Sequence, residues 1–287
     1  MVFFVGGESL VIPMLTAKLL RKNVVIASAG SGLQVAQAQK DPLARELALL
    51  QNVNYCLSDR IIIYSESLIE EHGLQKYKHK IPIAHKHFLD FDKFRTKKGF
   101  NERGNLIGYI GRLSKAKGVL NFLEAIPRIL EEKSDVEFVI VGDGQLQDKI
   151  EKYLDERNLK SKVKLLGWIP HDELPQYLNE LKLLVLPSYT EGLPNIMLEA
   201  MTCGAPVLAT CVGAIPDVIK DKETGFIMKN NSPECIARNV IRALNHSNLE
   251  KITRNARILV EKEFTYEKAV ERYREILSSF LREDSYG

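Results

Sequence analysis

Two carboxylates, Glu191 and Glu199, stand in a segment whose pattern suits binding of a polar ligand. Residues 186–201 read LPSYTEGLPNIMLEAM. Proline is tolerated in the first turn of a helix, so Pro194 predicts a helix start that leaves Glu191 in the preceding loop and puts Glu199 on the helix. Because each carboxylate accepts several hydrogen bonds, sugar hydroxyls are suitable partners. The alternative is a helix with one acid near its N-terminus and one ordinary exposed glutamate.

A second segment could bind an anion. Residues 108–118 read GYIGRLSKAKG, so an apolar run is followed by Gly111 and then by Arg112 and Lys117 before the next expected helix. A guanidinium group offers a bidentate fork and an ammonium group a point charge, and both suit phosphate oxygens. The alternative is a surface loop with solvated cations, because short motifs of this kind are weak evidence alone.

Two weaker features follow other apolar runs, and a third lies within the segment at 186–201. Gly142 lies in VGDG at 141–144, which allows close backbone approach but is not a Walker loop. Ile169 follows Trp168 in LGWIP at 166–170, where the main chain and an aromatic ring could contact a flat base; a tryptophan that caps the core is the alternative. The N–H groups of Leu193 and Asn195 would point at an anion.

The elements that must position these residues alternate between strand and helix patterns. Short apolar runs predict buried strands, and segments with helical period lie between them. This alternation indicates an α/β fold with a parallel sheet, whose ligands bind beyond the carboxyl ends of the strands. The expected strands are 24–28, 59–64, 106–110, 136–141, 163–166, 183–186 and 206–210, and the expected helices include 119–130, 146–154, 233–244, 249–262 and 266–281.

Composition excludes several classes of protein. The 287 residues suffice for one large domain or two modest ones, and a hydrophobic content of 45% suits a real core. A net charge of +3 does not indicate a nucleic-acid binder. The N-terminus lacks the basic and apolar regions of a signal peptide, and no apolar run is long enough to span a membrane. The four cysteines form no close pair, which is typical of reduced thiols in a cytosolic protein.

Residues 75–103 interrupt the alternation with seven lysines and nearby histidines. The part around 94–104 is expected to link two domains. The basic cluster is a solvated face or, alternatively, faces an anionic lipid surface. Asp90 and Asp92 have the spacing of a metal-binding pair, but they do not follow an expected strand. His85 and His87 lack a third ligand, so no metal site is expected.

Taken in this order and spacing, the four segments resemble the donor-binding domain of family 4 glycosyltransferases, which have the two-domain GT-B fold. The resemblance runs from about Leu106 to Phe226, with weaker similarity upstream. It implies two Rossmann-like domains, of which the N-terminal one is incomplete, with C-terminal helices packing back across the domains. The expected boundaries are 1–98 for the acceptor side, 99–264 for donor binding and 265–287 for a returning helix.

The resemblance also implies roles for individual residues. Arg112 and Lys117 would bind the donor diphosphate, Glu199 the ribose hydroxyls and Glu191 the transferred sugar. Catalysis would depend on Glu191, Arg112 and Lys117. The implied donor-binding set is Gly111, Arg112, Lys117, Gly142, Ile169, Glu191, Gly192, Leu193, Asn195 and Glu199, and a loop at Gly213-Ala214 stands where the family usually has a glycine pair.

The implied reaction is a retaining transfer of a hexose-type sugar from a UDP- or GDP-sugar to a glycan, lipid-linked or small-molecule acceptor. It would need neither a metal nor another cofactor. The nucleotide sugar and an unknown acceptor are the expected partners, nucleic acid is not, and the expected location is cytoplasmic, with peripheral contact at the inner face of the membrane as an option.

Two departures from the family pattern keep alternatives open. The family's acceptor domain begins with a strand and a Gly-rich loop upstream of the point that matches Met1, and Ala29-Gly30-Ser31-Gly32 replaces a segment that often contains a histidine. The first alternative is therefore a catalytically inactive or truncated nucleotide-sugar-binding protein. The second is another GT-B-like enzyme, such as a sugar-nucleotide epimerase.

Overall fold

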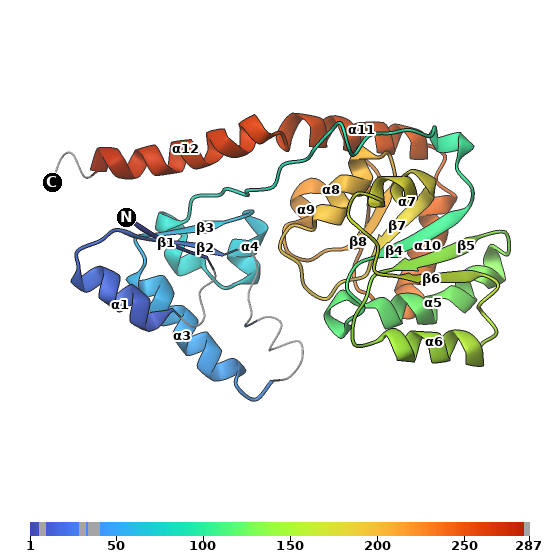
Figure 1. Ribbon diagram of the computed structural model, residues 1–287, viewed down its shortest axis with the longest axis horizontal. Coiled ribbons are helices and arrows are strands. Elements are labelled where there is room, and N and C mark those ends of the chain that lie inside the picture. The colour runs from blue at the N-terminus through green and yellow to red at the C-terminus, as the bar shows by residue number, and fades with distance from the viewer. Residues whose placement is uncertain (6–9, 29–32, 34–40, 284–287) are drawn as a thin grey trace. The chain divides into compact units, whose positions relative to one another are not determined.

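The computed structural model describes residues 1–5, 10–28, 33 and 41–283 (Figure 1). The chain forms two compact units. The first unit comprises Met1–Phe88, Thr190–Leu193 and Tyr266–Gly287, and the second comprises Leu89–Tyr189 and Pro194–Thr265. The units thus divide at Phe88 and Leu89, ten residues before the boundary expected from the sequence. The segment 29–32, where the family pattern is broken, lies outside the described residues.

The second unit is built on a six-stranded sheet in which every paired strand is parallel to its neighbour. Counted along the chain, its strands lie in the order 3-2-1-4-5-6, which is the doubly wound dinucleotide-binding order. Strands buried on both faces need continuous apolar runs, which is why five of the six were predicted from the sequence. The strands are β4 (Leu106–Ile110), β5 (Glu137–Val141), β6 (Val163–Gly167), β7 (Leu181–Leu186), β8 (Val207–Thr210) and β9 (Phe226–Met228).

Helices cover both faces of this sheet (Figure 1). On one face α5 (Val119–Glu132) packs against α10 (Pro233–Leu244), with α6 (Gln147–Glu156) beside them. On the other face α8 (Asn195–Thr202) packs against α7 (Leu174–Glu180) and α11 (Leu249–Glu263). The short α9 (Ile215–Val218) joins β8 to β9. The core under α5 and α10 is fully buried and includes Ile107, Tyr109, Phe122, Ile126, Phe138, Ile236 and Val240.

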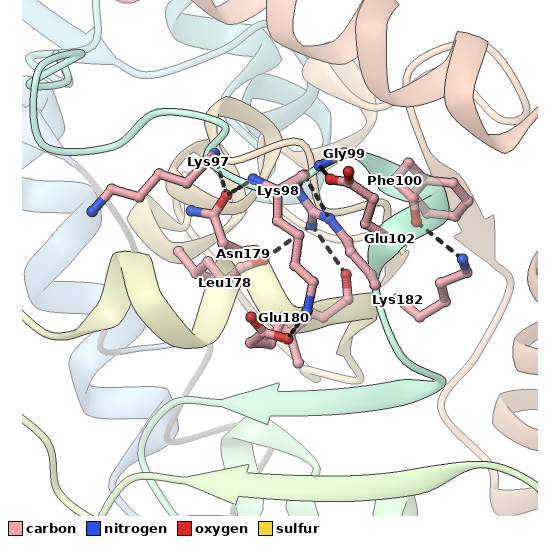
Figure 2. Close-up of polar contacts among 11 residues, drawn as sticks. Lys97, Lys98, Gly99, Phe100, Glu102, Leu178, Asn179, Glu180 and Lys182 are labelled. Atoms are coloured by element: carbon pink, nitrogen blue, oxygen red, sulfur yellow. Dashed lines mark hydrogen bonds and ion pairs between the residues drawn. The ribbon is translucent and has the colours of Figure 1, made fainter.

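The segment expected to link the domains is bound to the second unit (Figure 2). The side-chain oxygen of Asn179 accepts hydrogen bonds from the backbone N–H groups of Lys97 and Lys98, at 2.6 and 3.3 Å. The Lys98 ammonium also pairs with Glu180 at 2.5 Å. A short 3-10 helix, η2 (Phe100–Glu102), follows and leads directly into β4. These bonds fix the start of the sheet that carries the candidate site.

The first unit holds a three-stranded parallel sheet in the order β1-β2-β3. Its strands are β1 (Val2–Val5), β2 (Val24–Ser28) and β3 (Arg60–Ile63). The C-terminal helix α12 (Tyr266–Glu283) belongs to this unit, and its Tyr273 and Ile276 pack on a cluster formed by β2, β3 and Ala84. The last helix thus groups with the first unit, the part of the chain toward which it was expected to return. The remaining elements are α1 (Val11–Leu19), α3 (Ala44–Leu57), α4 (Ser67–Glu71) and the 3-10 helix η1 (Gln75–Lys80).

Within the described part of the chain, none of the helices combines the length and the apolar character that crossing a bilayer requires.

Candidate functional site

The sheet order of the second unit defines where a ligand can bind. The chain starts in the middle of the sheet at β4, proceeds outward through β5 and β6, and then returns to the other side of β4 as β7. The order therefore reverses between β4 and β7, and crevices for ligands open beyond the carboxyl ends of such strands. The loops that follow these two strands are 111–118 and 187–194, which contain most of the site residues predicted from the sequence.

Glycines allow the loops at this edge to approach each other closely. A Cβ atom on Gly142 would overlap the carbonyl oxygen of Gly111, and one on Gly118 would overlap the carbonyl oxygen of Pro187. Gly142 has a φ of +137° and Gly118 a φ of +69°, values that favour glycine. The loops after β4, β5 and β7 are thus in backbone contact, and the predicted site residues Gly111 and Gly142 lie side by side.

The two predicted cations lie in the loop after β4. Arg112 is exposed, and its carbonyl oxygen accepts a hydrogen bond from the hydroxyl of the buried Tyr109 at 2.8 Å. Lys117 is half-buried and ends the 3-10 helix η3 (Lys115–Lys117), one residue before the left-handed Gly118 that caps α5. Both cations therefore sit between a strand end and a helix N-terminus, which is a position that favours anions.

The loop after β6 joins the same cluster of loops. The N–H group of Gly142 donates to the carbonyl oxygen of Gly167 at 2.7 Å. Ile169 follows as a half-buried residue. Trp168 is 67% exposed, so the alternative that it caps the core is wrong. The exposed part of its indole ring is available to a planar ligand.

The loop after β7 leads into α8, and the predicted placement of the two glutamates is confirmed. Glu191 lies before the helix and Glu199 lies within it. One detail was wrong: Pro194 does not sit in the first turn, because its ψ of 120° is extended and α8 begins at Asn195. Both glutamates are buried, Glu191 to 9% and Glu199 to 5% exposure. The alternative of an ordinary exposed glutamate at Glu199 is therefore wrong.

The residues 190–193 group with the first unit, so Glu191, Gly192 and Leu193 belong to a different unit from Asn195 and Glu199. Within the first unit, His87 forms a hydrogen bond with the backbone of Leu193. Burial and, to a smaller extent, the charge of Lys86 lower the pKa of His87 to about 4, although the hydrogen bond with Leu193 acts to raise it. A neutral imidazole therefore holds one end of this loop at neutral pH.

Glu199 is the centre of a polar network in the second unit. His171 Nε2 lies 2.7 Å from Glu199 Oε1, and the Lys93 ammonium lies 3.0 Å from His171 Nδ1. The same ammonium pairs with Asp172 at 2.5 Å. Burial raises the pKa of Glu199, and the hydrogen bond from His171 and the charges of His171 and Lys93 oppose this rise. A buried carboxylate held in this way is a ready acceptor on its remaining lone pairs.

The pair of aspartates with metal-binding spacing has a structural role. Asp90 Oδ1 accepts from the N–H groups of Asp92 and Lys93, both at 3.0 Å, so it closes a turn at the start of the second unit. The region described by the structure contains no group of three or more His, Cys, Asp or Glu side chains arranged to hold a metal ion. A different feature is the loop at 213–214, where the family usually has a glycine pair. Its Gly213 has a φ of +59°, and Ala214 is buried.

Sequence reasoning did not find Lys93 and His171. His171 lies two residues after the predicted Ile169, so its position beyond a strand end was the available signal. Lys93 had none, because 78 residues separate it from its partner His171. Such a pairing depends on tertiary structure alone.

Comparison with known proteins agrees with this geometry. Residues 90–259 match the family model described as glycosyl transferases group 1. An uncharacterized glycosyltransferase of Methanocaldococcus jannaschii is 32% identical over 162 residues, which cover 56% of this chain and 44% of that protein. The N-acetyl-alpha-D-glucosaminyl L-malate synthase of Bacillus anthracis is 27% identical over 283 residues, 95% of this chain and 72% of that protein.

A solved structure shares the fold over nearly the whole chain. Anabaena Alr3699/HepE, crystallised with UDP and glucose, superimposes with a TM-score of 0.78 at 18% identity, covering 96% of this chain and 77% of that one. The predicted α/β fold of the GT-B kind is confirmed. The first three curated relatives are matched over 44%, 53% and 45% of their lengths, so the chain spans about half of each. Since the family model matches more than half of the chain, the protein belongs to the glycosyl transferases group 1 family.

Proposed function

We propose that this chain is a glycosyltransferase that takes its sugar from a nucleotide diphosphate sugar. The observation that carries the proposal is the switch point of the second sheet, where the loop with Arg112 and Lys117 contacts the loop that leads to Glu199. Besides the close approach of Gly118 to Pro187, the N–H group of Tyr189 donates to the carbonyl oxygen of Ala116 at 2.8 Å. The diphosphate and the nucleoside of the donor are assigned to the second unit, and acceptor recognition is assigned to the first.

The diphosphate is assigned to the loop after β4. Arg112 and Lys117 supply two positive charges next to the N-terminus of α5, and Gly111 and Gly142 let the ligand approach the backbone. Lys117 is half-buried and Arg112 is exposed, so a diphosphate that contacts both would lie along the surface of this loop. Charge on the leaving diphosphate grows during the reaction, so the same two cations would stabilise the transition state.

The nucleoside is assigned to Glu199 and the loop after β6. The buried Glu199 carboxylate would accept hydrogen bonds from the ribose hydroxyls. The main chain near Ile169 would meet the base, with the exposed Trp168 beside it. The sugar is assigned to Glu191, and its phosphate to the backbone after Gly192 together with Leu193 and Asn195 at the start of α8.

The proposed reaction retains the anomeric configuration and uses no metal. The bond between the anomeric carbon and the diphosphate oxygen breaks, and the acceptor oxygen forms a new bond on the same face. The acceptor's proton passes to the departing phosphate oxygen. No protein nucleophile is required, and Arg112 and Lys117 provide the positive charge that balances the leaving group.

The donor is proposed to be a UDP- or GDP-hexose, and the UDP in the Anabaena structure makes UDP the first choice to test. The acceptor is a glycan, a lipid-linked sugar or a small molecule. A cytoplasmic location is proposed, with peripheral contact at the inner face of the membrane if the acceptor is a lipid.

Titration calorimetry with UDP, GDP and a panel of their sugars tests the proposal. The wild-type chain should bind at least one nucleotide at micromolar to millimolar concentration, and Glu199→Ala should weaken it by about tenfold or more, because a charged acceptor is lost. Glu131→Ala is the matched control, since Glu131 is exposed on α5. Absence of binding at millimolar levels, or equal binding by Glu199→Ala, would disprove the proposal.

Turnover separates transfer from simple binding. An active transferase should hydrolyse or transfer the sugar of its donor at a measurable rate. Binding without either reaction would favour the alternative of an inactive nucleotide-sugar-binding protein.

A further inference from the structure

Among the described residues, His171 forms a hydrogen bond with the carboxylate of Glu199, and its ring also contacts Lys93 and Phe94. Its Nε2 lies 2.7 Å from Glu199 Oε1. Its Nδ1 lies 3.0 Å from the Lys93 ammonium. The ring of the buried Phe94 packs against the imidazole with a centroid separation of 5.2 Å. The imidazole is therefore fixed in position, although 58% of the side chain is exposed.

The partners determine which nitrogen of His171 carries the proton. The ammonium of Lys93 has donors and no acceptor, so Nδ1 must accept from it. Nε2 then carries a proton and donates it in the hydrogen bond to Glu199 Oε1. Lys93 is held in turn by Asp172, whose pKa is lowered chiefly by the hydrogen bond from Lys93. Lys93 thus donates to His171, and His171 donates to Glu199, whose carboxylate accepts.

This arrangement leaves one oxygen of Glu199 for a ligand. With Oε1 engaged by His171, the carboxylate cannot rotate freely, and Oε2 keeps a defined direction. A carboxylate that is held in one orientation before the ligand arrives loses less entropy on binding. The buried position of Glu199 strengthens each bond it makes, because water competes poorly there.

We propose that His171 is a positioning residue that orients Glu199 for the ribose hydroxyls, and that Lys93 fixes the tautomer that this requires. This inference rests on the proposed function, in which Glu199 binds ribose. Its consequence is that His171 governs how strongly the site distinguishes a ribonucleotide from a 2′-deoxyribonucleotide. A residue that merely stabilised the fold would weaken both nucleotides equally.

Binding of UDP and 2′-deoxy-UDP, or GDP and 2′-deoxy-GDP if guanine is preferred, provides the test. His171→Leu removes the donor, whereas His171→Gln keeps an N–H group at the place of Nε2 and an oxygen that can accept from Lys93. We expect His171→Leu to bind the ribonucleotide about tenfold more weakly and to lose most of the discrimination against the deoxy form. His171→Gln should stay within about threefold of wild type on both measures. His79→Leu, at an exposed histidine of the first unit, is the control.

Unchanged discrimination in His171→Leu, or an equal loss in His171→Gln, overturns the inference while leaving the proposed function intact. Failure of the wild-type chain to bind any nucleotide overturns the proposed function as well. A second measurement needs no nucleotide: the imidazole nitrogen signals of His171 in a ¹⁵N correlation spectrum should show Nε2 protonated and Nδ1 bare. Lys93→Met should change that pattern, and a protonated Nδ1 in the wild type would contradict the assigned order of donors.

Discussion

The guanidinium group of Arg103 donates a hydrogen bond to the backbone carbonyl oxygen of Cys203, 2.5 Å away, although the two residues are 100 positions apart in the chain. Cys203 ends α8, the helix that carries Glu199. The same guanidinium donates to the carbonyl oxygens of Leu178 and Leu181, at 3.2 and 3.1 Å. One cation, only 4% exposed, therefore ties together the ends of α7 and α8 and the start of β7. Positive charge at a helix C-terminus is also favourable to the helix dipole.

Replacing Arg103 should destabilise the second unit. Arg103→Met keeps the apolar length of the side chain but leaves several buried carbonyl groups without their donor, so we expect the free energy of unfolding in urea to fall by about 3 kcal/mol. Arg128→Met is the control, because the Arg128 side chain is 50% exposed and pairs with Glu234 at the surface. This substitution should lower the free energy of unfolding by less than about 1 kcal/mol. Similar losses in the two variants would contradict the role given to Arg103.

A single methyl group at Gly142 should disrupt the candidate site. The Cβ of Gly142→Ala would meet the carbonyl oxygen of Gly111, and the φ of +137° is unfavourable for alanine. We expect a loss of about 2 kcal/mol or more in stability, together with weaker nucleotide binding. Gly104→Ala is the matched control, because a Cβ there meets nothing within 4 Å, and should change stability by less than about 0.5 kcal/mol. Thermal unfolding and calorimetry on both variants measure the difference.

The sequence predicted the parts of the fold whose signal is local. Buried parallel strands need unbroken apolar runs, so β4 to β8 were found within two residues of their observed bounds. Strand β9 was not predicted, because a run of three residues is too short to stand out, and β1 was not predicted either. Arg112, Lys117 and Glu199 could be proposed as site residues because each follows a strand that could be recognised.

The remaining parts of the site depend on contacts between distant segments. Lys93 reaches His171 across 78 positions, and His171 reaches Glu199 across 28. No periodicity or spacing records such pairs. The burial of Arg103 is of the same kind: from the sequence it is one more cation in a basic stretch, and only the fold turns it into a donor to several buried carbonyl groups.

The two cations of the loop after β4 should contribute to phosphate binding and to little else. Arg112→Ala and Lys117→Ala should each weaken UDP binding by about tenfold and leave the weak binding of uridine, which has no phosphate, unchanged. Lys115→Ala tests the specificity of this effect, since Lys115 is exposed in the same loop and should matter little. Equal losses for UDP and uridine would show that the substitutions damage the fold instead of removing a phosphate contact.

The raised pKa of Glu199 gives a stability effect whose sign can be predicted. Burial raises this pKa above its ordinary value of 4.5, with the bond and charge of His171 acting against the rise. Between the ordinary and the raised value, the folded state binds more protons than the unfolded state does. Stability contributed by the protonated carboxyl is therefore lost as the pH rises through that window. Glu199→Gln does not titrate, so it should become progressively more stable than its parent as the pH rises from 4.5 toward neutrality.

Urea unfolding at a series of pH values measures this difference. This measurement is best made in the His171→Gln background, where the side chain beside the carboxyl group carries no charge. The gain in stability should come with weaker nucleotide binding at neutral pH, because glutamine has one fewer acceptor for the ribose hydroxyls. A stability difference that is constant with pH would show that the carboxyl group titrates normally. If the stability advantage of Glu199→Gln shrinks as the pH rises, the hydrogen bonds of the Glu199 carboxylate outweigh the cost of burying its charge.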